Sequence, residues 1–436
     1  METIGRGSPE NYVWPETLTT ALETENKERA LTFMRQMNTA DVKANSTSGR
    51  SSSNSSAADL IDSSQDLLTE IFLRLPVITL IRLTSVSKQW NFFIKSHSFG
   101  LLRNPHPDPP SGLFFEGWDA RSKYHYVPLD FGNTVNRPPF TTLRFDSGAI
   151  KILQSCNGLL LCVNDFQKYY IYNPTTNRFT TLPPLNNFNP DGFCCMTLAF
   201  DPSKSSHYKV VCNYMYRVMM IEIYSSKSGK WKISNERMDD LVDVDRGVYG
   251  HNAIHWMSFP NRLVYLKLDE ELLHYIDIDT PDTTIYGTIL DEFLTESRDG
   301  MLLVVRCCRF RRLNVYEINK DYSEWSIKYH VDLEEVIRVC PNMLTRLGLH
   351  FVVQSLVLGG REEDSFIVLE LPGKLIQYKF VLNTISQLRD FTTESRRCTH
   401  GGFFPKTIFQ LSDFTPENRR FINGSCFHFI PSLAAV

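Results

Sequence analysis

The spacing of hydrophobic residues changes once along the chain, near residue 105. Between 59 and 104, apolar residues such as Leu67, Leu68 and Ile71 recur at the spacing of one helix face. From 105 onward, short aromatic or β-branched runs alternate with turn signals such as Asn157-Gly158. The pattern predicts a small all-α unit at 59–104, followed by a large all-β domain at 105–436.

Three short helices are predicted within the α unit. A serine-to-acid capping signal precedes the first helix, and Pro76 ends it. A second helix can begin at Thr79, and a third begins at Ser87 and carries Trp90 on its apolar side. A unit of about 45 residues cannot cover so many large apolar groups by itself. We therefore expect a partner helix to cover the remainder.

The β region repeats one motif, in which an apolar residue is followed seven positions later by another, with turn residues between them. A two-stranded hairpin with a short loop gives this spacing. The four pairs are Tyr172 and Phe179, Tyr224 and Trp231, Ile278 and Ile285, and Ile318 and Trp325. The first members step by 52, 54 and 40 residues, and a weaker copy around Tyr378 follows.

A repeat near 50 residues is the spacing of kelch-like propeller blades. We therefore predict that the all-β domain is a kelch-like β-propeller with six or so blades. A β-sandwich is the alternative, because any all-β protein contains hairpins. Segment 332–346 has helical spacing and is predicted to be an insertion between blades.

Residues 1–58 form a polar, Ser-rich N-terminal arm. It ends in a low-complexity stretch with little to bury, which predicts disorder. A short amphipathic helix at 16–37 is the alternative.

Composition and charge narrow the class of protein. The formal net charge of −3 creates no overall positive electrostatic field that would attract a polyanion, so we expect no nucleic-acid partner. No secretory signal and no apolar window of membrane-spanning length occur, so we expect no membrane partner and a location in the cytosol, the nucleus or both. The ten cysteines contain no Cys-x-x-Cys spacing, and we expect neither a metal nor another cofactor.

Two regions of the chain contain segments that resemble known family motifs. Gln65-Asp66-Leu67-Leu68-Thr69-Glu70-Ile71-Phe72-Leu73-Arg74-Leu75-Pro76, followed by Val86-Ser87-Lys88-Gln89-Trp90, resembles an F-box. Ser155-Cys156-Asn157-Gly158-Leu159, Tyr172-Asn173-Pro174-Thr175-Thr176 and Asn252-Ala253-Ile254-His255-Trp256 resemble the F-box-associated domain that is common in plants. The Leu-Pro pair that usually opens an F-box is replaced here by Ser63-Ser64.

The resemblance implies a substrate-recognition subunit of a Skp–cullin–F-box ubiquitin ligase. The F-box would bind a Skp-type adaptor, and through it the cullin–RING ligase, while the β domain would hold an unidentified target protein. The resemblance assigns ten residues to the adaptor-facing and core surfaces: Leu67, Leu68, Ile71, Leu75, Pro76, Leu80, Leu83, Val86, Lys88 and Trp90. The alternative is a kelch-like interaction scaffold outside a ligase, with a degenerate F-box.

We expect no catalysis, because no motif for a nucleophile, a phosphate-binding loop or a zinc protease occurs. A propeller hydrolase with a dispersed site is a third interpretation. His251 and His255 lack a nearby acidic or cysteine partner and are assigned structural roles. Cys194 and Cys195 lie in an apolar run and are predicted to be buried core thiols. The basic run Arg306 to Arg312 would lie on a strand, whose alternation divides its charges between two faces.

Overall fold

The computed structural model describes residues 65–103, 110–116, 124–129, 150–185, 194–215, 218–239, 241–280, 292–298, 300–307, 311–345, 348–349, 351–390 and 426–436. The chain divides into two compact units, Met1–Arg103 and Asn104–Val436. The predictions for the N-terminal arm lie outside the described residues. Within the described residues, no helix is long and apolar enough to cross a membrane.

The described residues of the first unit form the short helices α3 (Gln65–Leu73), α4 (Val77–Leu83), α5 (Lys88–Ile94) and α6 (His97–Arg103). Pro76 sits at the N-cap of α4, where its fixed φ suits a helix start and its missing N–H costs nothing. Ser87 caps α5 by accepting a hydrogen bond from the Gln89 amide at 3.2 Å. The sequence pattern did not predict α6, which is only seven residues long. Arg103 ties it to α3 by donating to the Leu73 carbonyl at 3.1 Å.

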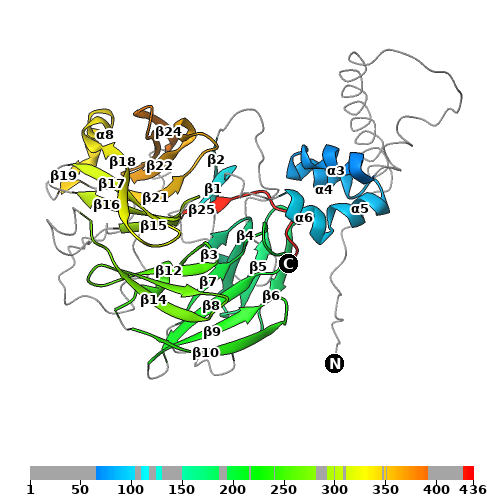
Figure 1. Ribbon diagram of the computed structural model, residues 1–436. Helices are drawn as coiled ribbons and strands as arrows, with labels where there is room; N and C mark the ends of the chain where they lie inside the picture. Colours follow the sequence, from blue (N-terminus) through cyan, green and yellow to red (C-terminus); the bar gives the residue numbers. More distant parts are fainter. Residues whose placement is uncertain are drawn as a thin grey trace, which may run out of the picture. The chain divides into compact units, whose positions relative to one another are not determined.

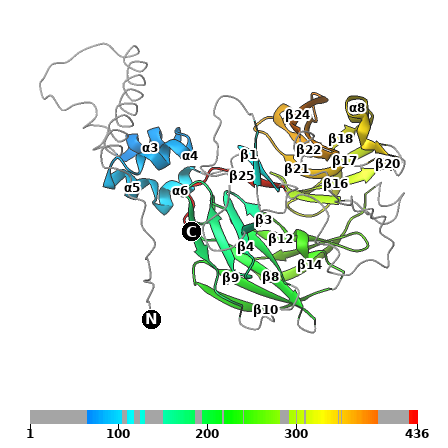
Figure 2. The same ribbon diagram turned by 180° about the vertical axis from the view of Figure 1, so that it is seen from behind.

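The second unit is a six-bladed β-propeller, which confirms the predicted fold class (Figures 1 and 2). Five blades are four-stranded antiparallel sheets. Their strands are β3 (Ile150–Cys156), β4 (Leu159–Asn164), β5 (Tyr169–Asn173) and β6 (Arg178–Thr181); β7 (Cys194–Ala199), β8 (Lys209–Met215), β9 (Met219–Ser225) and β10 (Lys230–Met238); β11 (Val248–Gly250), β12 (Ala253–Ser258), β13 (Arg262–Lys267) and β14 (Leu272–Asp277); β15 (Glu292–Glu296), β16 (Gly300–Cys307), β17 (Arg312–Asn319) and β18 (Trp325–Asp332); and β21 (Val352–Val357), β22 (Phe366–Leu371), β23 (Lys374–Lys379) and β24 (Thr384–Asp390).

The sixth blade closes the ring with strands from both ends of the propeller. Its order is β2 (Tyr124–Pro128), β1 (Gly112–Glu116) and β25 (Cys426–Phe429), so the last strand of the chain pairs with the first strand of the domain. The strand β25 contacts both β3 and β21, and successive first strands β3, β7, β11 and β15 contact one another. The first strand of each blade and β25 therefore surround the propeller axis.

The hairpin spacing found in the sequence is present in five blades. In each, a third-strand residue pairs with a fourth-strand residue seven positions later. These pairs are Tyr172 with Phe179, Tyr224 with Trp231, Leu266 with Leu273, Ile318 with Trp325, and Tyr378 with Ile385. The predicted anchor Ile278 was wrong: it follows β14, and its predicted partner Ile285 lies outside the described residues. The true anchor Leu266 makes the repeat more regular than the sequence suggested.

The predicted helical insertion is present between the blades that end with β18 and begin with β21. The helix α8 (Leu333–Val339) is capped by Asp332, whose carboxylate accepts from the Glu334 amide at 2.9 Å. Leu333 and Val336 are buried in the core cluster of these two blades. A short 3-10 turn and the paired β19 (Leu344–Thr345) and β20 (Gly348–Leu349) follow.

The core of the propeller lies between neighbouring blades. One cluster of buried residues runs through the blades that contain β4, β8 and β12, and includes Leu161, Val211 and Trp256. Each fully buried side chain of this size contributes roughly 1.5–3 kcal/mol to folding. The blades are thus held together by apolar packing, which leaves the turns at the two ends free for other roles.

Candidate functional site

The α unit is built around an aromatic cluster. The ring of Phe72 meets Trp90 edge-on at 5.2 Å and Phe99 edge-on at 6.3 Å, while Phe93 lies 5.1 Å from Phe99. The sequence assigned Trp90 an anchoring role in the third helix, and its contact with Phe72 places it in the core of the unit.

The ten residues assigned to the adaptor-facing and core surfaces separate by burial. Leu68, Leu80, Leu83 and Trp90 are buried; Ile71, Leu75 and Val86 are half-buried; and Leu67, Pro76 and Lys88 are exposed. The first group belongs to the core of the unit, so only the other six are placed to contact another molecule.

Two further large apolar side chains of the α unit are exposed and were missed by sequence reasoning. Phe92 on α5 is 80% exposed, and Leu102 on α6 is 58% exposed. Phe92 directly precedes the packed Phe93, so it lies on the other side of the amphipathic helix. An aromatic residue at such a position was the sequence signal that could have identified it. Together with Leu67, which is 50% exposed, these side chains expose apolar surface to water, which is unfavourable.

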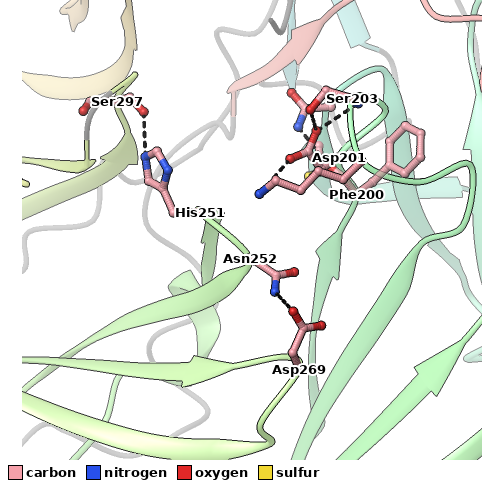
Figure 3. Close-up of polar contacts among 10 residues, drawn as sticks. Phe200, Asp201, Ser203, His251, Asn252, Asp269 and Ser297 are labelled. Atoms are coloured by element: carbon pink, nitrogen blue, oxygen red, sulfur yellow. Dashed lines mark hydrogen bonds and ion pairs between the residues drawn. The ribbon is translucent and has the colours of Figure 1, made fainter. Parts of the chain in front are cut away.

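The propeller has one end where the turns between first and second strands gather, here called the first-turn face. Among the described residues it comprises Asn157–Gly158, 200–208, 251–252, 297–298 and 358–365. Polar groups link these turns from blade to blade: Asn157 donates to the Phe200 carbonyl at 2.7 Å, and the Nε2 of His251 donates to the Ser297 carbonyl at 3.1 Å (Figure 3). Arg298 donates to the Gly359 carbonyl. These hydrogen bonds connect turns of neighbouring blades.

A polar cavity of about 370 Å³ opens on the first-turn face. Its lining combines cationic, anionic and neutral polar groups and includes Lys204, His251, Asn252, Lys267, Asp269, Glu270, Lys320 and Tyr322. The Asn252 side-chain amide donates a hydrogen bond to the Asp269 carboxylate (Figure 3). The Nζ of Lys204 lies 3.3 Å from the Asp201 carboxylate. The cavity therefore offers both donors and acceptors to a polar segment.

Burial shifts the protonation of two groups beside this cavity. It lowers the pKa of His251, so the imidazole is neutral at pH 7. It also raises the pKa of Glu296 to about 7, helped by the nearby charge of Asp201. Within the described residues, no three His, Cys, Asp or Glu side chains are grouped to hold a metal ion.

The two histidines of the sequence motif have different surroundings. His251 lies in a turn with φ of 49°, whereas His255 is buried on β12. The Nδ1 of His255 donates to the Val248 carbonyl at 3.4 Å, and its Nε2 accepts from the Tyr322 hydroxyl at 2.6 Å. Both histidines hold neighbouring segments together.

Two other sequence interpretations were wrong. The basic run does not lie on one strand: β16 ends at Cys307, β17 begins at Arg312, and Arg311 has a turn conformation with φ of 49°. Cys194 and Cys195 are half-buried, not buried, because they stand at the open end of β7.

The opposite end of the propeller presents exposed apolar side chains from two neighbouring blades, namely Met215, Val218, Leu241 and Phe259. The Phe259 amide donates to the Leu241 carbonyl at 3.0 Å, so these two residues are adjacent. Val218 precedes Met219, which pairs with Met238 near Leu241. No hydrophobic period marked these loop residues, which is why the sequence did not identify them.

The chain thus consists of a helical unit with exposed apolar side chains, followed by a β-propeller whose two ends bear loops. Family models match both parts: the F-box domain matches residues 64–102, and the F-box associated beta propeller domain matches residues 134–334. The chain belongs to the F-box protein family.

Curated relatives from Arabidopsis thaliana agree. The F-box protein At5g07610 is 31% identical over 377 residues, which cover 77% of this chain and 88% of that protein. The F-box protein At5g49610 is 26% identical over 301 residues, covering 64% of this chain and 81% of that protein. The propeller model ends at 334, so the structure extends the propeller beyond the matched segment to β25.

Proposed function

We propose that this protein is the substrate-recognition subunit of a Skp–cullin–F-box ubiquitin ligase. The observation that carries the proposal is the match of an F-box model to the helical unit, together with exposed apolar side chains on it. Leu67, Pro76 and Phe92 supply surface whose burial against an adaptor helix is favourable.

The propeller holds the target protein in this proposal. Its first-turn face, where hydrogen bonds connect turns of neighbouring blades, and the exposed apolar residues at its opposite end support that role, since loops on a stable scaffold commonly carry binding. The receptor contributes proximity between target and ligase, not bond chemistry. We place the protein in the cytosol, the nucleus or both.

Adaptor binding tests the proposal. The full chain is expected to bind a purified Skp-type adaptor, and the variant Leu67→Asp is expected to bind at least about tenfold more weakly, because it would bury an unpaired carboxylate. Leu67 is exposed on α3, so this substitution leaves the core of the α unit unchanged. Surface plasmon resonance with immobilised adaptor measures both affinities.

Leu272→Asp is the matched control, because Leu272 is 46% exposed and lies on β14 of the propeller. It should bind the adaptor as the wild type does. If the folded wild type does not bind, the ligase proposal fails, and the scaffold interpretation with a degenerate F-box, favoured by Ser63-Ser64, replaces it. If Leu67→Asp binds like the wild type, the exposed face of α3 is not the contact surface.

A further inference from the structure

Two cysteines on neighbouring strands face each other at the edge of one blade. In the β7–β8 ladder, Cys194 pairs with Tyr214, and Met196 pairs with Cys212. Cys194 and Cys212 are therefore diagonal neighbours on the same face of the sheet. Their Sγ atoms lie 3.2 Å apart. Cys195 points to the other face, where its thiol donates to Asp245.

The surroundings of the pair give its members different protonation. The hydrogen bond with Cys212 lowers the pKa of Cys194, and the Tyr169 hydroxyl, 4.0 Å away on the neighbouring blade, acts in the same direction. Burial and the charge of Glu222 act against this shift. The same hydrogen bond, together with burial, raises the pKa of Cys212. Cys194 is thus the partner that carries thiolate character, and Cys212 keeps its proton.

The pair differs from the other described cysteines whose pKa is shifted. Burial raises the pKa of Cys156, Cys162 and Cys426, and both burial and Asp245 raise that of Cys195. Cys194 is also half-exposed, whereas Cys156 and Cys162 are buried. Accessibility, thiolate character and a second thiol within reach therefore coincide only at Cys194 among these residues.

We propose that Cys194 and Cys212 form a peroxide-sensitive dithiol, which hydrogen peroxide converts to a disulfide between β7 and β8. In the first step, the Cys194 sulfur attacks one peroxide oxygen, the O–O bond breaks, and a sulfenic acid and water form. In the second step, the Cys212 sulfur attacks the sulfenic sulfur, and the hydroxyl leaves as water after taking up the Cys212 proton. Overall, two thiols lose two electrons and two protons, and one peroxide becomes two waters.

The position of Cys194 allows the bond to form with little rearrangement. A disulfide requires the sulfurs to approach to roughly 2.05 Å. Cys194 is the first residue of β7, so its backbone is constrained by the ladder on one side only. The bond would remove the Tyr169 contact and fix the β7 end to β8. The proposal concerns the propeller alone and does not depend on adaptor binding.

Non-reducing peptide mapping of the full chain after treatment with one equivalent of hydrogen peroxide tests the proposal. Trypsin separates the two cysteines into peptides 179–204 and 210–217, because Lys204 and Lys209 lie between them. We expect these peptides to be cross-linked, with the intact mass lower by roughly 2 Da. Fragmentation must place the bond at Cys194, and Cys195→Ser should retain it.

Two variants complete the test. Cys194→Ser, at a half-exposed strand end, should keep its fold and lose the cross-link, and Cys212→Ser should accumulate sulfenic acid at Cys194, detected by dimedone labelling. Iodoacetamide should label Cys194 at least about tenfold faster than Cys195 at pH 7. A cross-link through Cys195, a cross-link that forms equally fast in urea-unfolded chain, or oxidation of Cys194 without any cross-link to Cys212 would overturn the proposal.

Discussion

At the scale of single residues, burial decides the protonation of groups inside the propeller. It lowers the pKa of His255 to about 3 and that of His428 to about 4, so both rings remain neutral well below their usual range. His428 shares a 2.6 Å hydrogen bond with the Ser355 hydroxyl, which links β25 to β21. Glu296 shows the opposite case: burial favours its protonated form, which carries no charge.

Glu296 should make the propeller less stable as the pH rises. Its folded pKa of about 7 lies above the ordinary 4.5, so the folded state binds more protons between these values, and stability falls as the pH increases through this window. We expect Glu296→Gln to raise stability at pH 8 by about 1–2 kcal/mol, a figure reduced for the partial exposure of the side chain. The gain should vanish below pH 4.5.

Thermal unfolding of both proteins from pH 4 to pH 8 measures this effect. Glu363→Gln is the control, because Glu363 is exposed. This variant should be as stable as the wild type at every pH. A gain for Glu296→Gln that persists unchanged at pH 4 would contradict burial of the charge as its cause.

At the scale of elements, one buried asparagine fastens the chain's last segment to a hairpin. Asn173, at the end of β5, donates to the carbonyls of Ser432 and Ala434 at 3.1 and 2.8 Å. Its Oδ1 accepts from the amides of Thr175 and Thr176. The asparagine thus shapes its own turn and holds a segment that lies more than two hundred residues away in sequence.

Removal of the Asn173 side chain should cost much more than removal of an exposed asparagine. Asn173→Ala leaves several buried backbone groups without partners, so we expect a loss of roughly 2–4 kcal/mol in the free energy of unfolding. Asn235→Ala, at an exposed position of β10, should change it by less than about 0.5 kcal/mol. Urea unfolding followed by tryptophan fluorescence compares the two, and equal losses would show that the anchor is energetically unimportant.

At the scale of the whole propeller, ring closure rests on a blade assembled from distant segments. β25 contributes Phe429, which is fully buried and meets Phe114 of β1 edge-on at 5.6 Å and Tyr126 of β2 at 5.9 Å. Antiparallel pairing of β1 with both β2 and β25 completes the closure. The ring therefore depends on β25, near the end of the chain, as much as on β1.

Phe429→Ala should weaken the closing blade and, with it, the entire ring. We expect it to lower the free energy of unfolding by about 3–5 kcal/mol, since it removes a large buried ring that packs against Phe114 of β1 and Tyr126 of β2. Phe166→Ala, which removes a ring that is 68% exposed, is the control and should cost little. Differential scanning calorimetry gives both values, and a Phe429→Ala protein as stable as Phe166→Ala would contradict closure through this strand.

The hairpins were predictable because their signals are local. Seven-residue spacing between paired apolar residues follows from strand and turn geometry, so the sequence contains it at Tyr172, Tyr224 and Ile318. The anchor at Ile278 was misplaced because Ile276-Asp277-Ile278, at and just beyond the end of the outer strand β14, alternates isoleucine with an acid as the third-strand segment Ile221-Glu222-Ile223 does. The short helix α6 was missed because seven residues are too few to establish a helical period, although they include Phe99, Leu101 and Leu102.

The sequence by itself determined the two-part organisation and the helical and strand periods, because each depends on residues close to one another in the chain, and its resemblance to an F-box implied the adaptor-facing candidates. Only the tertiary structure decided which of those candidates are exposed, which strand closes the ring and which cysteines meet. These features join residues far apart in the chain, such as Asn173 with Ala434, and no local period records them. Local patterns depend on residues that are neighbours along the chain, whereas distant residues come together only through packing in the folded protein.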